Sequence, residues 1–275
     1  MQVITSKDNE TIKSIKKLKE KKYREEQNCY IIEGIKIVSE AILENVDIQK
    51  IVICEECLKN NSIDKKMLYD IAKYDCIYVS EAVFKTITEV NTPQGIIAVV
   101  KQNNKKDIIE FNGDLILILD GIQDPGNLGT ILRTADSIGL KQIILSGKCG
   151  DVYNPKVVRS TMGAIFRVNI IKSKNLVETI SQIKENGFKI VATDLKTDHT
   201  IYDIDYVKTA IVIGNEANGV SSDVLSISDN RVKIPMIGKT ESLNASVATG
   251  VILYEYVRRT IKWFKKGEKY VKEKI

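Results

Sequence analysis

Residues 114–120 read Asp114-Leu115-Ile116-Leu117-Ile118-Leu119-Asp120, a continuous apolar run between two carboxylates. Such a run is typical of a strand that is buried on both faces of a parallel sheet. A loop rich in glycine and proline follows from Gly121 to Gly126, and Asn127 is predicted to open a helix to about Ile138. Gly139 ends that helix, and residues 142–146 form the next strand. This order of elements is typical of nucleotide-binding α/β units.

The same alternation of helices and strands continues to the end of the chain. The sequence predicts a parallel sheet flanked by helices, with a helix over 175–185 and strands over 188–193, 210–214 and 231–235. A long final helix is expected from about Ser242 to Lys262, with a packing face of Ala245, Ala248, Thr249 and Ile252.

The first hundred residues predict a separate, smaller α/β domain. A basic amphipathic helix is expected over 9–22, and the later pattern predicts helices over 33–43, 65–73 and 81–87 with strands over 50–54, 77–79 and 95–100. The polar segment 101–107 then reads as a linker. We therefore expect two domains, 1–105 and 106–275, each long enough to bury a core.

The charge balance permits a polyanionic partner without requiring one. The 275 residues carry 41 Lys and Arg against 36 Asp and Glu, a net charge of +5. Two clusters stand out, and ordinary solvated helix faces remain an equal alternative for each. They comprise Lys7, Lys13, Lys16, Lys17, Lys19, Lys21, Lys22 and Arg24 near the start, and Arg258, Arg259, Lys262, Lys265, Lys266 and Lys269 near the end.

Cysteine usage points to a reducing compartment and to no metal site. Five cysteines form a single Cys-x-x-Cys, at Cys54 and Cys57, and His199 is the one histidine. A zinc site needs further ligands, and no disulfide framework is visible. No run of about 18 apolar residues is present, so we expect a cytoplasmic protein without a membrane span.

Three short motifs in the second half carry the chemistry. Asn127 and Arg133 lie six residues apart on the first predicted helix, where an arginine fork suits a substrate phosphate. Gly214 and Glu216 lie in a turn after a buried strand, where glycine lets the backbone approach a ligand and the carboxylate can anchor polar side chains. The alternatives are an N-cap and a surface arginine for the first motif, and an ordinary strand-to-helix turn for the second.

The third motif combines Ile234-Pro235-Met236 with Ser242, Leu243 and Asn244 ahead of the last helix. Ser242 is predicted to cap this helix and to touch a ligand, and the free main-chain amides of its first turn could hold a polar group. A capped helix with a face of small residues is the equal alternative.

In this order and spacing, the motifs resemble those of the SpoU (TrmH) family of RNA ribose 2′-O-methyltransferases. The family pattern is Asn-x-Gly-x-x-x-Arg, then Gly-Asn-Glu-Gly-x-Gly, then Ile-Pro-Met with Ser-Leu-Asn-x-Ser-x-Ala, and the match covers about residues 114 to 262. Ala217 replaces the usual second glycine, so the turn should not need a positive φ there. The first half resembles the family's ribosomal-protein-like substrate-binding domain.

The resemblance implies a fold, a cofactor and a set of roles. The expected fold is α/β with a trefoil knot in the second domain, and the expected assembly is a homodimer with the active site near the subunit interface. The cofactor is S-adenosyl-L-methionine and the substrate is RNA. The implied cofactor contacts are Thr193, Gly214, Ile234, Met236, Ser242, Leu243 and Asn244, and the implied catalytic set is Asn127, Arg133, Glu216 and Asn244.

Because guanidinium stays protonated, Arg133 is expected to grip a phosphate beside the hydroxyl rather than to act as a free base. Glu216 is expected to orient Asn127 or Arg133. Ribosomal RNA is favoured over transfer RNA by the separate first domain, and antibiotic-resistance methylation stays open. A nicotinamide-dependent dehydrogenase is disfavoured because Gly121, Gly126 and Gly129 do not follow the Gly-x-Gly-x-x-Gly spacing. A non-catalytic RNA-binding protein is the other alternative.

Overall fold

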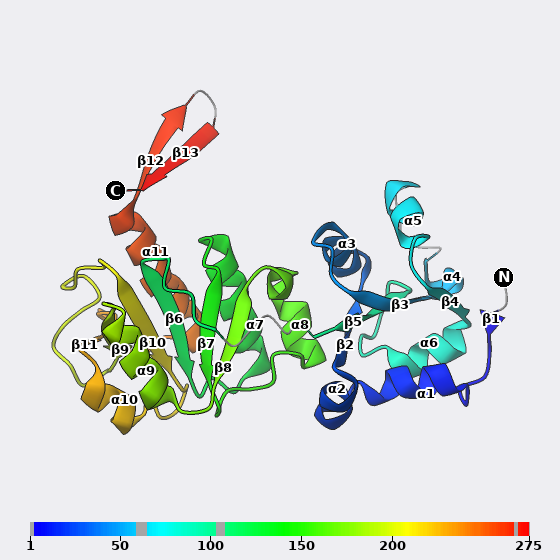
Figure 1. Ribbon diagram of the computed structural model, residues 1–275, viewed down its shortest axis with the longest axis horizontal. Coiled ribbons are helices and arrows are strands. Elements are labelled where there is room, and N and C mark those ends of the chain that lie inside the picture. The colour runs from blue at the N-terminus through cyan, green and yellow to red at the C-terminus, as the bar shows by residue number, and fades with distance from the viewer. Residues whose placement is uncertain (1–2, 59–64, 103–107, 267–268, 275) are drawn as a thin grey trace. The chain divides into compact units, whose positions relative to one another are not determined.

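The structure is a computed structural model that describes residues 3–58, 65–102, 108–266 and 269–274. It divides into two compact units (Figure 1). The first contains Met1–Asn104 together with Asp151–Arg167, and the second contains Lys105–Gly150 and Val168–Ile275. The predicted domain boundary near residue 105 falls within 103–107, outside the described residues.

The second unit contains a six-stranded, fully parallel sheet, which confirms the predicted architecture. Its strand order is β11-β9-β10-β6-β7-β8. The sheet centre is β6, the run of apolar residues that Asp120 ends, and all six of its residues are buried. The strands are β6 (Leu115–Asp120), β7 (Gln142–Ser146), β8 (Asn169–Ser173), β9 (Lys189–Thr193), β10 (Thr209–Gly214) and β11 (Asn230–Val232).

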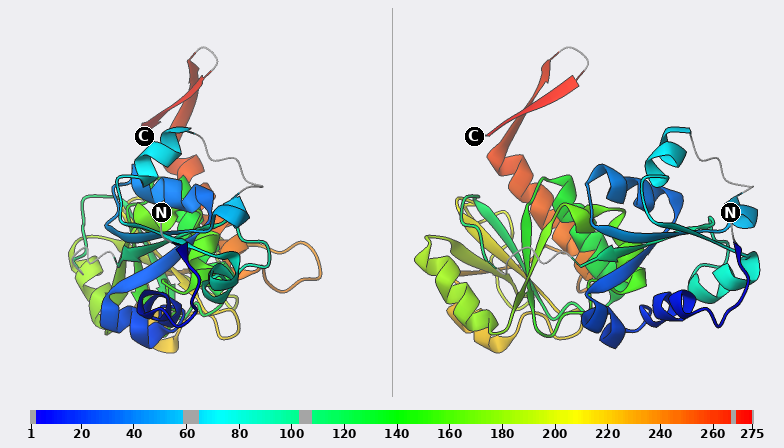
Figure 2. Two further views of the ribbon diagram at one scale, coloured as in Figure 1. Left: turned by 90° about the vertical axis from the view of Figure 1, so that its right-hand side faces the viewer. Right: turned by 45° about the vertical axis from the view of Figure 1, so that its right-hand side comes forward.

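Helices cover both faces of this sheet (Figure 2). Alternate residues of β6, Ile116 and Ile118, share one core cluster with Ile180 and Ile183 of α9 (Leu176–Glu185) and with Val224 of α10 (Ser222–Ile227). The other face is covered by α7 (Pro125–Ser137) and α11 (Ala245–Thr260), which pack together. No helix in the described part of the chain is both long and apolar enough to span a bilayer.

Two predicted helix boundaries in this unit are wrong. Helix α7 begins at Pro125 rather than Asn127, because the carboxylate of Asp124 accepts the Asn127 amide at 2.8 Å and proline suits the first helical position. Helix α11 runs over Ala245–Thr260 instead of 242–262. The chain then forms an antiparallel hairpin of β12 (Ile261–Lys266) and β13 (Lys269–Lys274), which projects beyond α11 in both views of Figure 2.

The first unit is built on a five-stranded mixed sheet of order β1-β4-β3-β5-β2. Its buried side chains form a core with those of α1 and α6. The strands are β1 (Val3–Ile4), β2 (Cys29–Glu33), β3 (Ile48–Ile53), β4 (Cys76–Val79) and β5 (Ile96–Lys101). The helices are α1 (Glu10–Lys17), α2 (Lys21–Gln27), α3 (Ile35–Leu43), α4 (Glu55–Leu58), α5 (Lys65–Ile71) and α6 (Glu81–Ile87).

The single basic helix predicted over 9–22 is instead the pair α1 and α2, and strand β2 was not predicted. The predicted apolar face is real, since Ile12, Ile15 and Leu18 are buried. The break follows Leu18, whose main-chain oxygen accepts a hydrogen bond from Arg24 at 2.8 Å. Arg24 and Lys19 bind main-chain oxygens of the first unit, so neither belongs to a solvated basic face as the sequence suggested.

A segment from the middle of the chain completes the first unit. Residues 151–167 carry α8 (Pro155–Thr161) and a 3₁₀ turn, η1 (Ala164–Phe166). Arg24, 2% exposed, forms an ion pair with Asp151 in which Nη2 and Oδ2 lie 2.5 Å apart. The rings of Tyr30 and Tyr153 pack at 4.6 Å between centroids. The core of this unit therefore depends on residues far apart in the sequence.

We expect Arg24→Met to lower the free energy of unfolding by about 3–5 kcal/mol, because it leaves the Asp151 carboxylate buried without its cation. Urea titration followed by circular dichroism measures the change. The matched control is Lys85→Met, which removes the exposed pair between Lys85 and Glu81 and should cost at most about 1 kcal/mol. Equal losses in the two variants would contradict a dominant role for the buried pair.

Candidate cofactor and catalytic site

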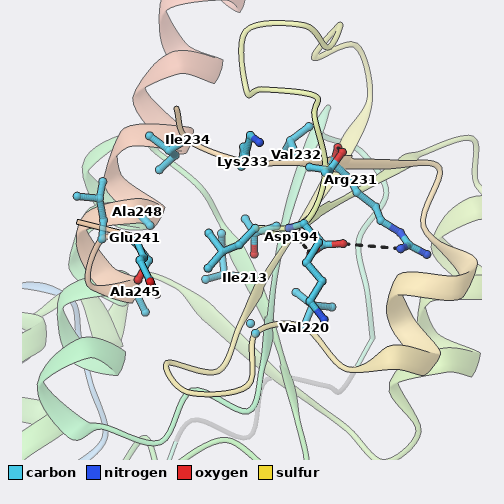
Figure 3. Close-up of a pocket in the computed structure, with 18 of the residues that line it drawn as sticks. Asp194, Ile213, Val220, Arg231, Val232, Lys233, Ile234, Glu241, Ala245 and Ala248 are labelled. Atoms are coloured by element: carbon cyan, nitrogen blue, oxygen red, sulfur yellow. Dashed lines mark hydrogen bonds and ion pairs between the residues drawn. The ribbon is translucent and has the colours of Figure 1, made fainter. Parts of the chain in front are cut away.

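The site lies at the carboxyl ends of β9, β10 and β11, where open α/β sheets bind ligands. The loops after these strands line one cavity of about 1250 Å³ (Figure 3). Ile213, Ile234, Ala245 and Ala248 supply apolar walls. The cavity therefore combines apolar surface with the polar side chains of three loops, as small-molecule sites do.

All seven residues that the sequence assigned to cofactor binding line this cavity. They come from three separate stretches of chain, and they are Thr193, Gly214, Ile234, Met236, Ser242, Leu243 and Asn244. Apart from Glu216, sequence reasoning missed the charged residues that line it, among them Asp194 and Arg231, which form an ion pair at 3.7 Å (Figure 3). No local motif marks these residues, because each belongs to the cavity only through sheet pairing.

A tight turn after β10 shapes the cavity floor. Asn215 and Gly219 bridge each other through paired main-chain bonds of 2.9 Å. Asn215 Oδ1 accepts from the amide of Ala217 at 2.9 Å, and its Nδ2 donates to the Gly121 oxygen at 2.8 Å. Ala217 does not have a positive φ, which confirms that this turn does not need glycine there.

Gly214 is required by the turn itself. A Cβ at this position would lie 2.1 Å from Gly219 C and from Val220 N, far inside contact distance. The sequence indicated that glycine lets a ligand approach the backbone. The structure shows a different cause, because the chain folds back against its own strand end.

Three of the four predicted catalytic residues form one hydrogen-bonded chain. Asn127 Nδ2 donates to Glu216 Oε1 at 2.9 Å, and Asn244 Nδ2 donates to Asn127 Oδ1 at 2.9 Å. Asn215 Nδ2 donates to the other Glu216 oxygen at 3.3 Å. The carboxylate receives amide donors on both oxygens, and of the two residues that Glu216 was expected to orient, Asn127 is the one that it contacts.

The cap of the last helix is Asn244, which corrects the expectation for Ser242. Asn244 Oδ1 accepts from the amides of Ser246 at 3.0 Å and Val247 at 3.4 Å. Its oxygen thus satisfies first-turn donors of α11, while its Nδ2 joins the chain to Asn127. Those two amides are consequently not available to a ligand, contrary to the sequence expectation.

Arg133 lies apart from this chain. It is exposed on α7, whereas Asn127 is 8% exposed. Six helical positions turn the direction of a side chain by about 600°, which leaves the two residues on different sides of the helix. Arg133 is not among the described residues that line the cavity.

The cavity offers both apolar and charged surface to a ligand. Apolar side chains form its walls, and Glu216 and Glu241 bring carboxylates to it. Between Ile234 and Leu243, no main-chain amide donates a hydrogen bond to another described residue. Unpaired amides of this kind can serve a ligand. The lining residues therefore fit a ligand with apolar parts, hydrogen-bond acceptors and a cationic group.

Comparison with known proteins identifies the family. Residues 114–254 match the model of the SpoU rRNA Methylase family. The chain belongs to the SpoU rRNA methylase family. It is 32% identical over 255 residues to the 23S rRNA (guanosine(2553)-2′-O)-methyltransferase RlmP of Bacillus subtilis, with 92% of this chain and 98% of that protein covered.

Solved structures of this family agree with the fold of the chain. An AdoMet-bound rRNA methyltransferase from Sinorhizobium meliloti is 31% identical, with a TM-score of 0.82 over 94% of this chain and 97% of that one. The SpoU methyltransferase AviRb from Streptomyces viridochromogenes, in complex with AdoMet, is 26% identical, with a TM-score of 0.78 over 91% and 97%. Residues 9–98 match the MRM3-like substrate binding domain. This family member is an RNA methyltransferase.

Gly214→Ala should destabilise the second unit by more than about 3 kcal/mol, because the added methyl group overlaps main-chain atoms that cannot move independently. Chemical denaturation measures the loss. Gly238→Ala is the matched control, since its Cβ would meet no atom within 4 Å, and its effect should stay within about 0.5 kcal/mol. A stable Gly214→Ala protein would mean that the turn can open.

Proposed function

We propose that this chain transfers a methyl group from S-adenosyl-L-methionine to a ribose 2′-hydroxyl of 23S ribosomal RNA in the cytoplasm. The proposal rests on one observation: Glu216 and Asn244, which line the cavity, are both hydrogen-bonded to Asn127. The name of the Bacillus subtilis relative supports the substrate. Residues 1–105 serve as the RNA substrate-binding domain and residues 106–275 as the methyltransferase domain.

The cofactor is held by the three loops that line the cavity. Ile234 and Leu243 supply apolar contacts, and the main chain of 234–243 supplies donors. When bound, the cofactor supplies an electrophilic methyl carbon on its sulfonium. The same loops would shield a bound cofactor from water, and no residue of the chain needs to form a covalent bond. We infer that these loops belong to a trefoil knot, as the family resemblance implies.

Arg133 acts on the RNA rather than on the cofactor. Its guanidinium stays protonated at neutral pH and presents a planar fork of donors. Bound to the phosphate next to the target ribose, this cation orients the hydroxyl and favours loss of its proton to the phosphate or to water. The exposure of Arg133 on α7 supports this role, because a solvent-facing arginine can reach an incoming polyanion.

Hydrogen bonds among Glu216, Asn127 and Asn244 hold the turn after β10 against the starts of α7 and α11. The donor and acceptor of each of these hydrogen bonds are fixed, because the Glu216 carboxylate can only accept and Asn127 must therefore donate to it through Nδ2. Asn127 is therefore held with its oxygen toward Asn244 and its amide nitrogen toward Glu216. A fixed amide at the start of α7 positions the helix that carries Arg133.

A second copy of the chain completes the assembly through the face formed by α7 and α11. Val247, Val251 and Tyr254 of α11 are 52%, 36% and 54% exposed. Tyr254 lies 3.3 Å from Ser137 Oγ of α7, so this apolar stripe adjoins the helix of Arg133. Covering the stripe with the same face of a partner would bring Arg133 close to the interface.

The activity is tested with purified protein, methyl-labelled S-adenosyl-L-methionine and total RNA from cells that lack the protein. We expect label in 23S ribosomal RNA as an alkali-resistant dinucleotide, which marks a 2′-O-methyl group. Label confined to transfer RNA would overturn the ribosomal assignment. Tight RNA binding without label would favour the non-catalytic alternative.

Arg133→Lys should reduce turnover by about 10- to 100-fold, because a single ammonium replaces a bidentate charged contact worth about 1.5–3 kcal/mol. Affinity for S-adenosyl-L-methionine, measured by calorimetry, should stay near that of the unmodified protein, and this measurement serves as the internal control. Unchanged turnover would exclude a required bidentate grip on phosphate.

Val251→Asp should convert a dimer into monomers, since it buries an unpaired carboxylate at the proposed contact. Sedimentation equilibrium measures the mass. Val207→Asp is the matched control, because Val207 is 65% exposed and lies outside α7 and α11. The mass of this variant in solution should equal that of the native protein. A native protein that is monomeric at every concentration would rule out this dimer.

A further inference from the structure

Outside the cavity, the first unit holds two adjacent thiols that the proposed function does not use. Cys54 follows β3, and Cys57 lies on α4. Their sulfur atoms are 2.9 Å apart. Cys54 is fully buried and Cys57 is half-buried, so solvent reaches the pair from the Cys57 side. These two residues form the Cys-x-x-Cys motif, which by itself supplies too few ligands for a zinc site.

The main chain around the pair is fixed by the loop that precedes β5. The Cys54 amide donates to the Gly95 oxygen at 2.9 Å, and the Leu58 amide donates to the Cys54 oxygen at 3.1 Å. Gly95 has a φ of +82°, and a Cβ there would lie 2.9 Å from Cys57 Cβ. These contacts hold the two cysteines side by side. Each thiol therefore meets the other at a high effective concentration.

The Cys54 thiol is hard to ionise. Burial raises the pKa of Cys54 to about 12, and its hydrogen bonds to Cys57 and Glu56 add to the increase. Cys54 is therefore a weak nucleophile toward dissolved disulfides, and it reacts with a sulfur atom that is held next to it, where proximity offsets its low thiolate fraction. No group of three or more His, Cys, Asp or Glu side chains in the described ranges could hold a metal ion. The short distance between the two sulfur atoms is the arrangement that thiol–disulfide exchange needs.

We propose that Cys54 and Cys57 form a reversible intramolecular disulfide by exchange with a low-molecular-weight disulfide. The Cys57 thiolate attacks one sulfur of that disulfide and releases a first thiolate. Cys54 then attacks the Cys57 sulfur and releases the second thiolate, which takes up the Cys54 proton as it departs. Two cysteine thiols are oxidised, one external disulfide is reduced to two thiols, and the two protons end on the released thiolates.

Oxidised glutathione is the probe for this exchange. The native protein is incubated with it, quenched in acid, alkylated and digested with trypsin, which releases residues 51–59 with both cysteines. We expect this peptide to lose two hydrogen atoms in mass and to lose alkylation at both positions, and dithiothreitol should reverse both changes. Peptides with Cys29, Cys76 and Cys149 from the same digest are the controls and should stay alkylated.

Variants separate ring closure from simple adduct formation. Cys54→Ser should accumulate a glutathione adduct on Cys57, whereas Cys57→Ser should show neither adduct nor disulfide in this peptide. A stable glutathione adduct on Cys57 of the native protein would overturn the proposal, since it would show that Cys54 does not resolve it. A peptide that stays fully alkylated in excess oxidised glutathione would overturn it as well.

Discussion

Glu216 can only accept hydrogen bonds, and this restriction sets the arrangement of the whole site. Its two oxygens take the amide groups of Asn127 and Asn215, so Asn127 must turn its own oxygen toward Asn244. Asn244 then uses its oxygen to cap α11. One carboxylate thereby ties together the starts of two helices and the turn after β10. Loss of the charge would release all three at once.

The second unit was predictable because its central strands are continuous apolar runs. Strand β7 has the predicted bounds, and β6 differs by one residue. Strand β8 escaped notice because Asn169–Ser173 mixes polar and apolar residues. The division of the first basic segment into two helices was not predictable either. It depends on Arg24, whose guanidinium is held by a carboxylate 127 residues away.

The sequence brings together many of the residues that line the cavity, but it leaves out Asp194 and Arg231 and includes Arg133, which lies outside the lining. The family pattern places Thr193, Ser242 and Leu243 near the cofactor, and all three line the cavity. Local sequence could not choose the cap of α11, since Ser242 and Asn244 are both good caps. Only the position of Asn127, brought close by the folded sheet, decides that Asn244 takes the role.

The contribution of Asp151–Arg167 to the first unit affects how the protein folds during synthesis. Arg24 leaves the ribosome 127 residues before the carboxylate that neutralises it. Meanwhile β6, α7 and β7 emerge and can begin their own sheet. A nascent chain that stops before residue 151 therefore exposes an incomplete core with an uncompensated guanidinium. The first unit can therefore be completed only after part of the second has been translated, so the two units do not fold strictly one after the other.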